Sequence, residues 1–94
     1  PAVLRLIDIT CQGAKKYGKP VAVCGAVAGD LQAVPLLIGL GVTELAVGAA
    51  SVAPIKARVR SLNQKDCAQT ARQALTLGSA GEVRDLVKKT FAVN

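Results

Sequence analysis

Two short apolar stretches of similar sequence constrain the fold of this chain more than any other feature. KPVAVCG begins at Lys19 and TELAVGA begins at Thr43, and each is followed by small residues and then by a helical segment. Short apolar runs bounded by Pro and Gly are typical of buried strands. Because a helical segment separates the two runs, they can pair in parallel through a right-handed crossover. The sequence therefore predicts an α/β fold with strands at residues 21–24 and 45–47.

The two faces of these strands carry side chains of different size. Neighbouring side chains of a strand point to opposite faces, so the residues divide into two sets. We expect helices to cover the face with larger residues. The other face should line a curved interior or a cavity, with Cys24 at its carboxyl-end rim. Two strands alone leave bare edges, so a closed barrel needs further strands. The larger set is Val21, Val23, Leu45 and Val47, and the smaller set is Ala22, Cys24, Ala46 and Gly48.

The segments before and between the strands have helical spacing. An amphipathic helix is predicted over residues 2–17, ended by Gly18. Asp30 is a candidate N-cap for a helix over residues 31–40, which a pair of glycines closes. The apolar stripe of the first helix comprises Val3, Leu6, Ile7, Thr10, Ala14 and Tyr17.

Three further helices are predicted after the second strand. Ser51 can cap the first of them, with Pro54 tolerated in its first turn. A second apolar stripe predicts a helix over residues 64–77. Ser79 and Glu82 form a capping box that opens the last helix. The buried faces of the last two helices comprise Cys67, Ala71, Ala74 and Leu75, and Val83, Leu86, Val87 and Phe91, respectively.

These elements predict a single partial domain over residues 1–94. A helix occupies residues 1–18, two strand–helix units occupy residues 19–62, and a helical extension occupies residues 63–94. A self-sufficient domain usually has about 100 to 150 residues, so the core of this chain should be small. The chain opens with Pro1 and enters a helical pattern directly, which suggests the excised end of something longer.

Composition argues against several functional classes. Hydrophobic residues make up 51% of the chain, but Tyr17 and Phe91 are its only aromatic residues. The net charge of +6 comes from scattered basic residues, and without an aromatic stacking platform we expect no nucleic-acid partner. The apolar span over residues 31–54 is interrupted by Pro, Gly and Glu, so we expect no membrane helix. No signal peptide is predicted, which favours a cytoplasmic location.

The three cysteines differ in what their positions allow. Without histidine or a C-x-x-C pair, they support neither a zinc site nor a disulfide framework. Cys11 and Cys67 lie on helical apolar stripes and are predicted to be core residues. Cys24 is either a small buried hydrophobe, the commonest fate of a free cysteine, or a catalytic residue, because α/β folds place their chemistry at the carboxyl ends of strands.

A functional Cys24 has a definite predicted role. No cation or histidine adjoins Cys24, and apolar surroundings raise the pKa of a thiol. A protonated thiol is better suited to donating a proton than to covalent attack. The sequence therefore favours general acid catalysis over a covalent thioester.

The glycines and carboxylates near the strand ends carry weaker signals. CGAVAG lacks both the G-x-x-x-x-G-K-[ST] and the G-x-G-x-x-G patterns, so Gly25 and Gly29 mainly permit a tight turn and a close backbone approach. Amides near Leu31 can help to hold an anion at a helix start, and Gly25 is a weak candidate substrate contact. Asp30 is predicted to be a cap, and Glu44 precedes its strand. No metal site is predicted from these residues.

Three stretches of the sequence match a pattern found in a known family. They are GKPVAVCGAVAGD, AVPLLIGLGVTELAVGAASVAPIKARVR and the closing two-helix segment. Together they resemble the C-terminal end of enzyme I of the bacterial phosphoenolpyruvate:sugar phosphotransferase system, over essentially all 94 residues. Pyruvate phosphate dikinase and phosphoenolpyruvate synthase have a similar cysteine motif. The two helices after the last barrel helix make the chain look more like enzyme I.

The resemblance implies a fold and an activity. The fold would be a (β/α)8 TIM barrel that binds phosphoenolpyruvate and Mg²⁺, with this chain supplying its last two strand–helix units and two extra C-terminal helices. The phosphoryl group would pass to a histidine on a separate domain and then to a histidine-containing phosphocarrier protein. The family's cysteine maps onto Cys24, where it is taken to act as general acid or base at the methylene carbon as enolpyruvate becomes pyruvate.

The resemblance also sets limits on the chain alone. The family's metal-binding carboxylates, phosphate-binding arginines and phosphoryl-accepting histidine have no counterpart here, so we expect the isolated chain to be inactive. The family usually has Glu where this chain has Ala26, which can weaken loop order. Because the parent barrel dimerises, a homo-oligomer is expected. Two alternatives stay open: a fragment of a dikinase or synthase, and a non-catalytic basic binding or assembly module.

Overall fold

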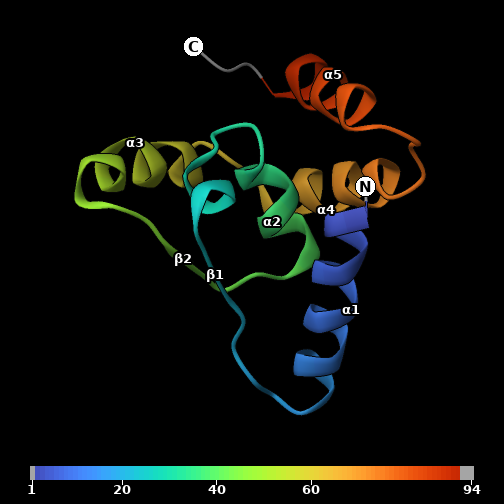
Figure 1. Ribbon diagram of the computed structural model, residues 1–94, viewed down its shortest axis with the longest axis horizontal. Helices are drawn as coiled ribbons and strands as arrows, with labels where there is room; N and C mark the ends of the chain where they lie inside the picture. Colours follow the sequence, from blue (N-terminus) through green and yellow to red (C-terminus); the bar gives the residue numbers. More distant parts are fainter. Residues whose placement is uncertain (1, 92–94) are drawn as a thin grey trace.

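The computed structural model describes residues 2–91 and contains two strands and six helical segments in that range. Figure 1 shows their arrangement, with the chain running from helix α1 to helix α5. The elements in order are α1 (Ala2–Lys16), β1 (Ala22–Cys24), the 3-10 helix η1 (Ala26–Gly29), α2 (Val34–Leu40), β2 (Glu44–Ala46), α3 (Ala49–Arg60), α4 (Gln64–Ala74) and α5 (Ala80–Thr90).

The two strands pair in parallel, as the sequence predicted. Val23 lies opposite Leu45, and Cys24 lies opposite Ala46. Thr43 secures the start of the pair, because its hydroxyl accepts a hydrogen bond from the Val21 amide and donates one to the Val21 carbonyl, both at 3.0 Å. Helix α2 lies between the strands in the chain, which is the crossover that a parallel pair requires.

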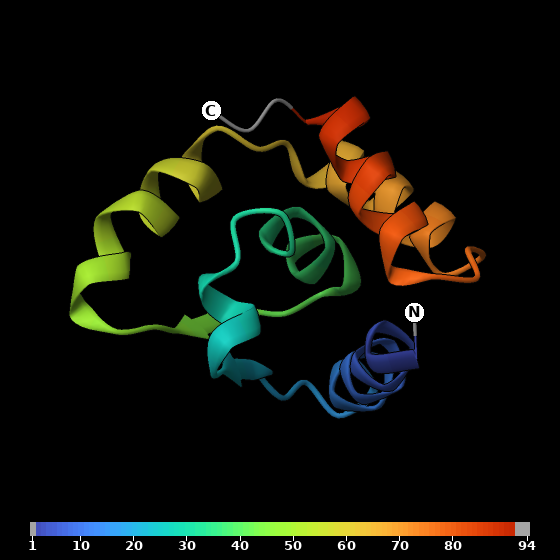
Figure 2. The same ribbon diagram turned by 45° about the horizontal axis from the view of Figure 1, so that its top comes forward.

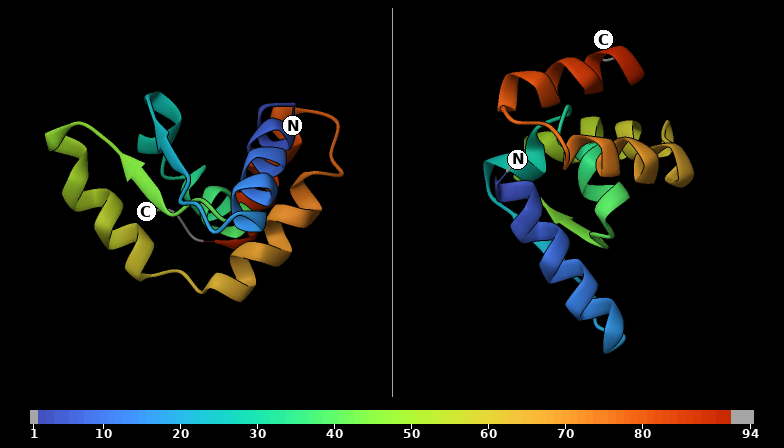
Figure 3. Two further views of the ribbon diagram at one scale, coloured as in Figure 1. Left: turned by 90° about the horizontal axis from the view of Figure 1, so that it is seen from below. Right: turned by 90° about the vertical axis from the view of Figure 1, so that its right-hand side faces the viewer.

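The two faces of the strands also differ in exposure. Val23 and Leu45 are half-buried, whereas Ala22, Cys24 and Ala46 are exposed. Within residues 2–91, the prediction that the two strands are buried is therefore wrong. The reason is that no element in this part of the chain covers the face with the small residues, as Figure 3 shows for the strands between α1 and α3.

The core lies around α2 and not around the strands. Figure 2 shows α2 in the middle of the molecule, with the other elements arranged around it. Helix α2 makes its most extensive contacts with α4, and Val34, Leu36 and Leu37 are buried. Burial of large aliphatic side chains is the main driving force for folding, so the pair α2 and α4 holds the chain together.

Both C-terminal helices form where the sequence predicted them, but α4 ends at Ala74 and not at residue 77. The Ser79 hydroxyl accepts a hydrogen bond from the Glu82 amide at 3.2 Å, which confirms Ser79 as the N-cap, and donates one to the Glu82 carboxylate at 3.1 Å, so the Glu82 side chain reaches back to the cap as the pattern predicted. The apolar stripes on α4 and α5 face the core as expected. Their buried members are Cys67, Ala71, Ala74, Val83 and Val87.

Two predicted helix starts are wrong. Helix α2 begins at Val34, because Asp30 first forms a turn: its Oδ1 accepts from the Gln32 amide at 2.9 Å, and its carbonyl accepts from the Ala33 amide. This turn delays the regular helix. Helix α3 begins at Ala49, and its N-cap is Gly48, whose backbone is extended.

Residues inside α3 therefore differ in role from the prediction. Ser51 lies inside the helix and does not cap it, and Pro54 lies beyond the first turn. The early start has a local cause, because Ala49 and Ala50 are strong helix formers that extend the helix towards Gly48.

Helix α1 is confirmed, but its apolar side chains lie on two faces. Leu4 and Ile7 pack against the core, and Cys11 is buried. Val3, Leu6 and Tyr17 of the predicted stripe are more than 60% exposed. The helix contacts α2 through only one of its two apolar faces, so the predicted stripe is largely uncovered.

None of the helices between residues 2 and 91 combines the length and the apolar character that crossing a bilayer would require.

Candidate active site at the end of the first strand

Cys24 is the last residue of β1, and its side chain is exposed. The chain turns away directly after it at Gly25, whose φ is 91° and ψ is −169°. A residue with a Cβ is strained at a positive φ of this size, so the turn requires glycine. The sequence prediction that Gly25 permits a tight turn is consistent with this backbone. The thiol therefore stands at the carboxyl end of a parallel strand, beside a sharp change of direction.

The loop after Gly25 is short and ordered. Residues 26–29 form the 3-10 helix η1, in which the Ala28 amide donates to the Gly25 carbonyl at 3.2 Å. Ala28 is fully buried and fixes the middle of the loop, and the Asp30 amide donates to the Val27 carbonyl. The prediction about a missing carboxylate at Ala26 concerns a side chain outside the described residues.

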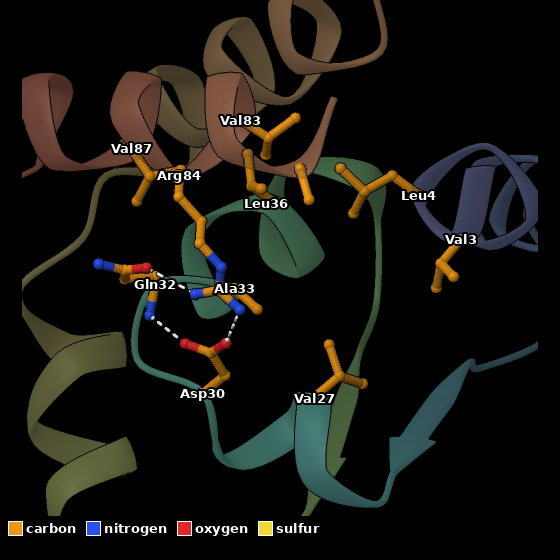
Figure 4. Close-up of a pocket in the computed structure, with 11 residues that line it drawn as sticks. Val3, Leu4, Val27, Asp30, Gln32, Ala33, Leu36, Val83, Arg84 and Val87 are labelled. Atoms are coloured by element: carbon orange, nitrogen blue, oxygen red, sulfur yellow. Dashed lines mark hydrogen bonds and ion pairs between the residues drawn. The ribbon is translucent and has the colours of Figure 1, made fainter. Parts of the chain in front are cut away.

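The loop ends in a turn that contacts two distant helices. Arg84 of α5 forms an ion pair with the Asp30 carboxylate at 3.0 Å and donates to the Gln32 side-chain carbonyl at 2.6 Å. Arg58 of α3 donates from Nε to the Leu31 carbonyl at 3.3 Å. Figure 4 shows Arg84 reaching down from α5 to Asp30 and Gln32 at the edge of an open pocket.

This pocket has a volume of about 230 Å³ and mostly apolar walls. Leu4 of α1, Leu36 of α2 and Val83 of α5 contribute to these walls, and Val27 of η1 closes one side. The pocket therefore lies between the C-terminal helix and the loop that follows Cys24.

The two other thiols differ from Cys24 in environment. Cys11 and Cys67 are buried, which confirms their prediction as core residues. Burial raises the pKa of the Cys11 thiol, and the nearby Asp8 carboxylate adds to the effect. Burial also raises the pKa of the Cys67 thiol; Asp66 adds to that effect, while Arg58 opposes it. Cys24, in contrast, is exposed to solvent. The apolar surroundings predicted for its thiol are therefore not found among the described residues. The alternative prediction, that Cys24 is an inert buried residue, is not found either.

Comparison with known proteins identifies the family. Residues 1–64 match the family described as PEP-utilising enzyme, PEP-binding domain, where PEP is phosphoenolpyruvate. The chain belongs to this family.

Three curated relatives of the chain share one name. The chain is 40% identical over 93 residues to the phosphoenolpyruvate-protein phosphotransferase of Geobacillus stearothermophilus. It is 37% identical over 91 residues to the protein of the same name from Bacillus subtilis, and 41% identical over 91 residues to that from Mycoplasma pneumoniae. These matches cover 97–99% of the chain, which itself spans about 16% of the length of each relative. The resemblance to enzyme I is confirmed at this level. The matches extend over α4 and α5, beyond the residues that define the PEP-binding family.

The described residues of the chain do not fit a Mg²⁺ site. Between residues 2 and 91, no group of three or more Asp, Glu, Cys or His side chains could hold a metal ion. Asp30 is paired with Arg84, and Glu44 lies opposite Ala22, at the other end of the strand pair from Cys24. No chemical step is therefore assigned to a metal in this chain.

The sequence predicted Cys24 and Gly25 as candidate site residues but did not predict the contacts that Arg58 and Arg84 make with the turn after them. Arg58 and Arg84 lie on helices that are remote in sequence from the loop, and each is one of many scattered basic residues. Only the way α3 and α5 pack around α2 brings them to the turn at residues 30–33. A local sequence pattern contains no signal for such a contact.

Proposed function

We propose that this chain forms the last two strand–helix units, and the C-terminal helical extension, of a (β/α)8 barrel in a phosphoenolpyruvate-protein phosphotransferase of the enzyme I type. The parallel pair of β1 and β2, joined through α2 and followed by α3, supports this architecture. In a barrel, one face of each strand points into the interior, and further strands close the barrel around it. The face with the small residues, which is exposed in this chain, would be the interior face. In this proposal the strand edges bind neighbouring strands of the same barrel.

The reaction of the whole protein follows from its relatives' name and from the resemblance. It transfers the phosphoryl group of phosphoenolpyruvate to a histidine and then to a histidine-containing phosphocarrier protein. The acceptor histidine lies elsewhere in the protein, since this chain has none. The Mg²⁺ ion of the reaction would likewise be bound by residues outside this chain. A cytoplasmic location stays a prediction.

Cys24 supplies the proton in this proposal. When the phosphoryl group leaves phosphoenolpyruvate, enolpyruvate is left with a carbon–carbon double bond. The Cys24 thiol donates its proton to the methylene carbon, the electrons of the double bond form the new C–H bond, and the oxygen at the central carbon becomes the carbonyl of pyruvate. The thiolate then regains a proton from water, which reaches it because the side chain is exposed.

The position of Cys24 is the observation that carries the proposal. Catalytic residues of TIM barrels lie at the carboxyl ends of the strands, on the loops that lead to the next helix. Cys24 lies at this end of β1 and its side chain is exposed to solvent. Gly25 turns the backbone away from it. Cys11 and Cys67 are buried in the helical core and offer no such access.

Replacement of Cys24 tests the role. In the intact protein, Cys24→Ala should lower the rate of pyruvate formation from phosphoenolpyruvate by about 10²- to 10⁴-fold, the usual contribution of a positioned acid or base. Cys11→Ala is the matched control, because it removes a thiol from the helical core and should change the rate by less than about twofold after correction for folded protein. A Cys24→Ala rate equal to wild type would reject the role.

A second measurement tests the architecture. The 94-residue chain alone should form no pyruvate from phosphoenolpyruvate, since it holds neither an acceptor histidine nor a metal site among its described residues. Sustained turnover by the isolated chain would contradict the proposal that the active site is completed by other parts of the protein.

A further inference from the structure

Two arginines from helices that are distant in sequence meet at the turn that follows the Cys24 loop. Arg84 of α5 contacts both side chains that form this turn, at 3.0 Å to Asp30 and 2.6 Å to Gln32. Arg58 of α3 donates to the Leu31 carbonyl, and its guanidinium lies 5.9 Å from the centre of the Phe91 ring, within the range of a cation–π contact. Consecutive residues of one turn are thus held from two sides.

The loop between Cys24 and this turn is held at its two ends and near its middle. Its first end is fixed by the pairing of Cys24 with Ala46 in the strand pair. Between the ends, the short helix η1 is held by the hydrogen bond from the Ala28 amide to the Gly25 carbonyl and by the burial of Ala28. The other end is fixed by the turn at residues 30–33. Movement of this turn would therefore change the backbone that leaves Cys24.

Arg84 is better suited than Arg58 to an experiment on this anchor. Its side chain is 55% exposed, so its replacement removes polar contacts without opening a cavity in the core. It contacts two side chains with one guanidinium, whose planar fork gives the contact a defined direction. Asp30 in turn accepts a hydrogen bond from the Gln32 amide, so the carboxylate links Arg84 to the backbone of the turn.

We infer that Arg84 is a positioning residue: it holds the turn at residues 30–33 and thereby keeps the loop after Cys24 in the geometry that proton donation needs. The C-terminal helical extension then influences catalysis through the position of this loop. This inference rests on the proposed function for its effect on the reaction, while the anchoring itself is a property of the chain alone.

Hydrogen exchange of the intact protein tests the anchoring without any reference to activity. Arg84→Gln should speed amide exchange in residues 25–33 by about two- to fivefold, the range expected when one exposed ion pair is lost. Lys88→Gln is the matched control, because it makes the same change of charge on the same helix. It should leave the amide exchange rates of residues 25–33 unchanged. Equal exchange in the wild type and Arg84→Gln would overturn the inference.

Kinetics of the same variants test positioning against a general loss of structure. Arg84→Gln should lower kcat for pyruvate formation by about three- to tenfold and change the KM for phosphoenolpyruvate by less than twofold, because a misplaced donor slows the proton transfer and leaves substrate binding intact. Arg84→Lys should recover part of kcat. An unchanged kcat would overturn the inference, as would a rise in KM alone.

A double variant separates this inference from the proposed function. In the Cys24→Ala background, Arg84→Gln should have no further effect on kcat, since the residue that it positions is gone. A full additional loss would show that Arg84 acts by another route and would overturn the inference. If Cys24→Ala itself keeps the wild-type rate, the proposed function fails, and the exchange measurement decides the anchoring alone.

Discussion

At Gly39 a single missing carbon atom sets how closely two helices approach. Residue 39 lies on α2 where this helix packs against α4, and an added Cβ would collide with the backbone carbonyl of Cys67 and lie 2.9 Å from the Cβ of Ala71. Backbone atoms cannot move aside as a flexible side chain can. The contact between α2 and α4 therefore depends on glycine at this position.

Gly39→Ala should destabilise the chain by about 1–3 kcal/mol, the usual cost of overpacking a tight core. The free energy of unfolding from urea denaturation measures the change. Gly13→Ala is the control, because a Cβ at residue 13 meets no atom within 4 Å and alanine favours a helix interior by up to about 1 kcal/mol. Gly39→Ala protein as stable as wild type would contradict the close approach.

Single residues were predicted well where their signal is local. The roles of Gly25 as a turn residue and of Cys11 and Cys67 as core residues follow from neighbours in the sequence, and the structure agrees with them. Arg84 could not be predicted, because its partners Asp30 and Gln32 lie on a remote segment. A contact of this kind is fixed by tertiary packing, which a single sequence does not display.

At the scale of elements, the caps show which predictions from sequence succeed. Ser79 and Glu82 satisfy each other's polar groups at the start of α5, so a pattern of four residues was sufficient. Ser51 has the right residue type for a cap, but α3 begins earlier, at Ala49. The start of a helix is a competition between neighbouring positions, and residue type alone does not decide it.

Ser79→Ala should lower the free energy of unfolding by about 1 kcal/mol, since the helix loses the acceptor for its Glu82 amide. Thermal or urea unfolding of the intact chain measures this loss. Ser51→Ala offers a close comparison, because the same substitution inside α3 removes no cap and favours the helix slightly. If the two variants lose equal stability, Ser79 does not cap α5.

At the scale of the whole molecule, the chain has a covered side and an uncovered side. The helical core is enclosed, whereas the small-residue face of the strands and one apolar face of α1 are exposed. The sequence predicted buried strands because their residue pattern is that of a strand covered on both faces. Under the barrel proposal, further strands would cover the faces that are exposed in residues 2–91, which would account for this error of the prediction.

The isolated chain should self-associate through these uncovered surfaces, as bare strand edges and exposed apolar side chains favour. Light scattering over a range of concentrations should show an average mass above that of the 9.6 kDa monomer. Leu6→Lys, at a residue 66% exposed, should shift the average mass towards the monomer. Lys15→Gln changes charge on the same helix and should not. A monodisperse wild-type monomer would contradict the prediction.

The packing of α4 against α2 has a consequence for how the protein is made. Helix α2 is synthesised before α4, so Leu36 stays without its α4 cover until α4 has left the ribosome. A polypeptide truncated or stalled before α4 would expose this apolar side chain. Such a polypeptide would be prone to aggregate and would be a target for chaperones and proteases. The core around α2 is therefore completed only after α4 has been translated.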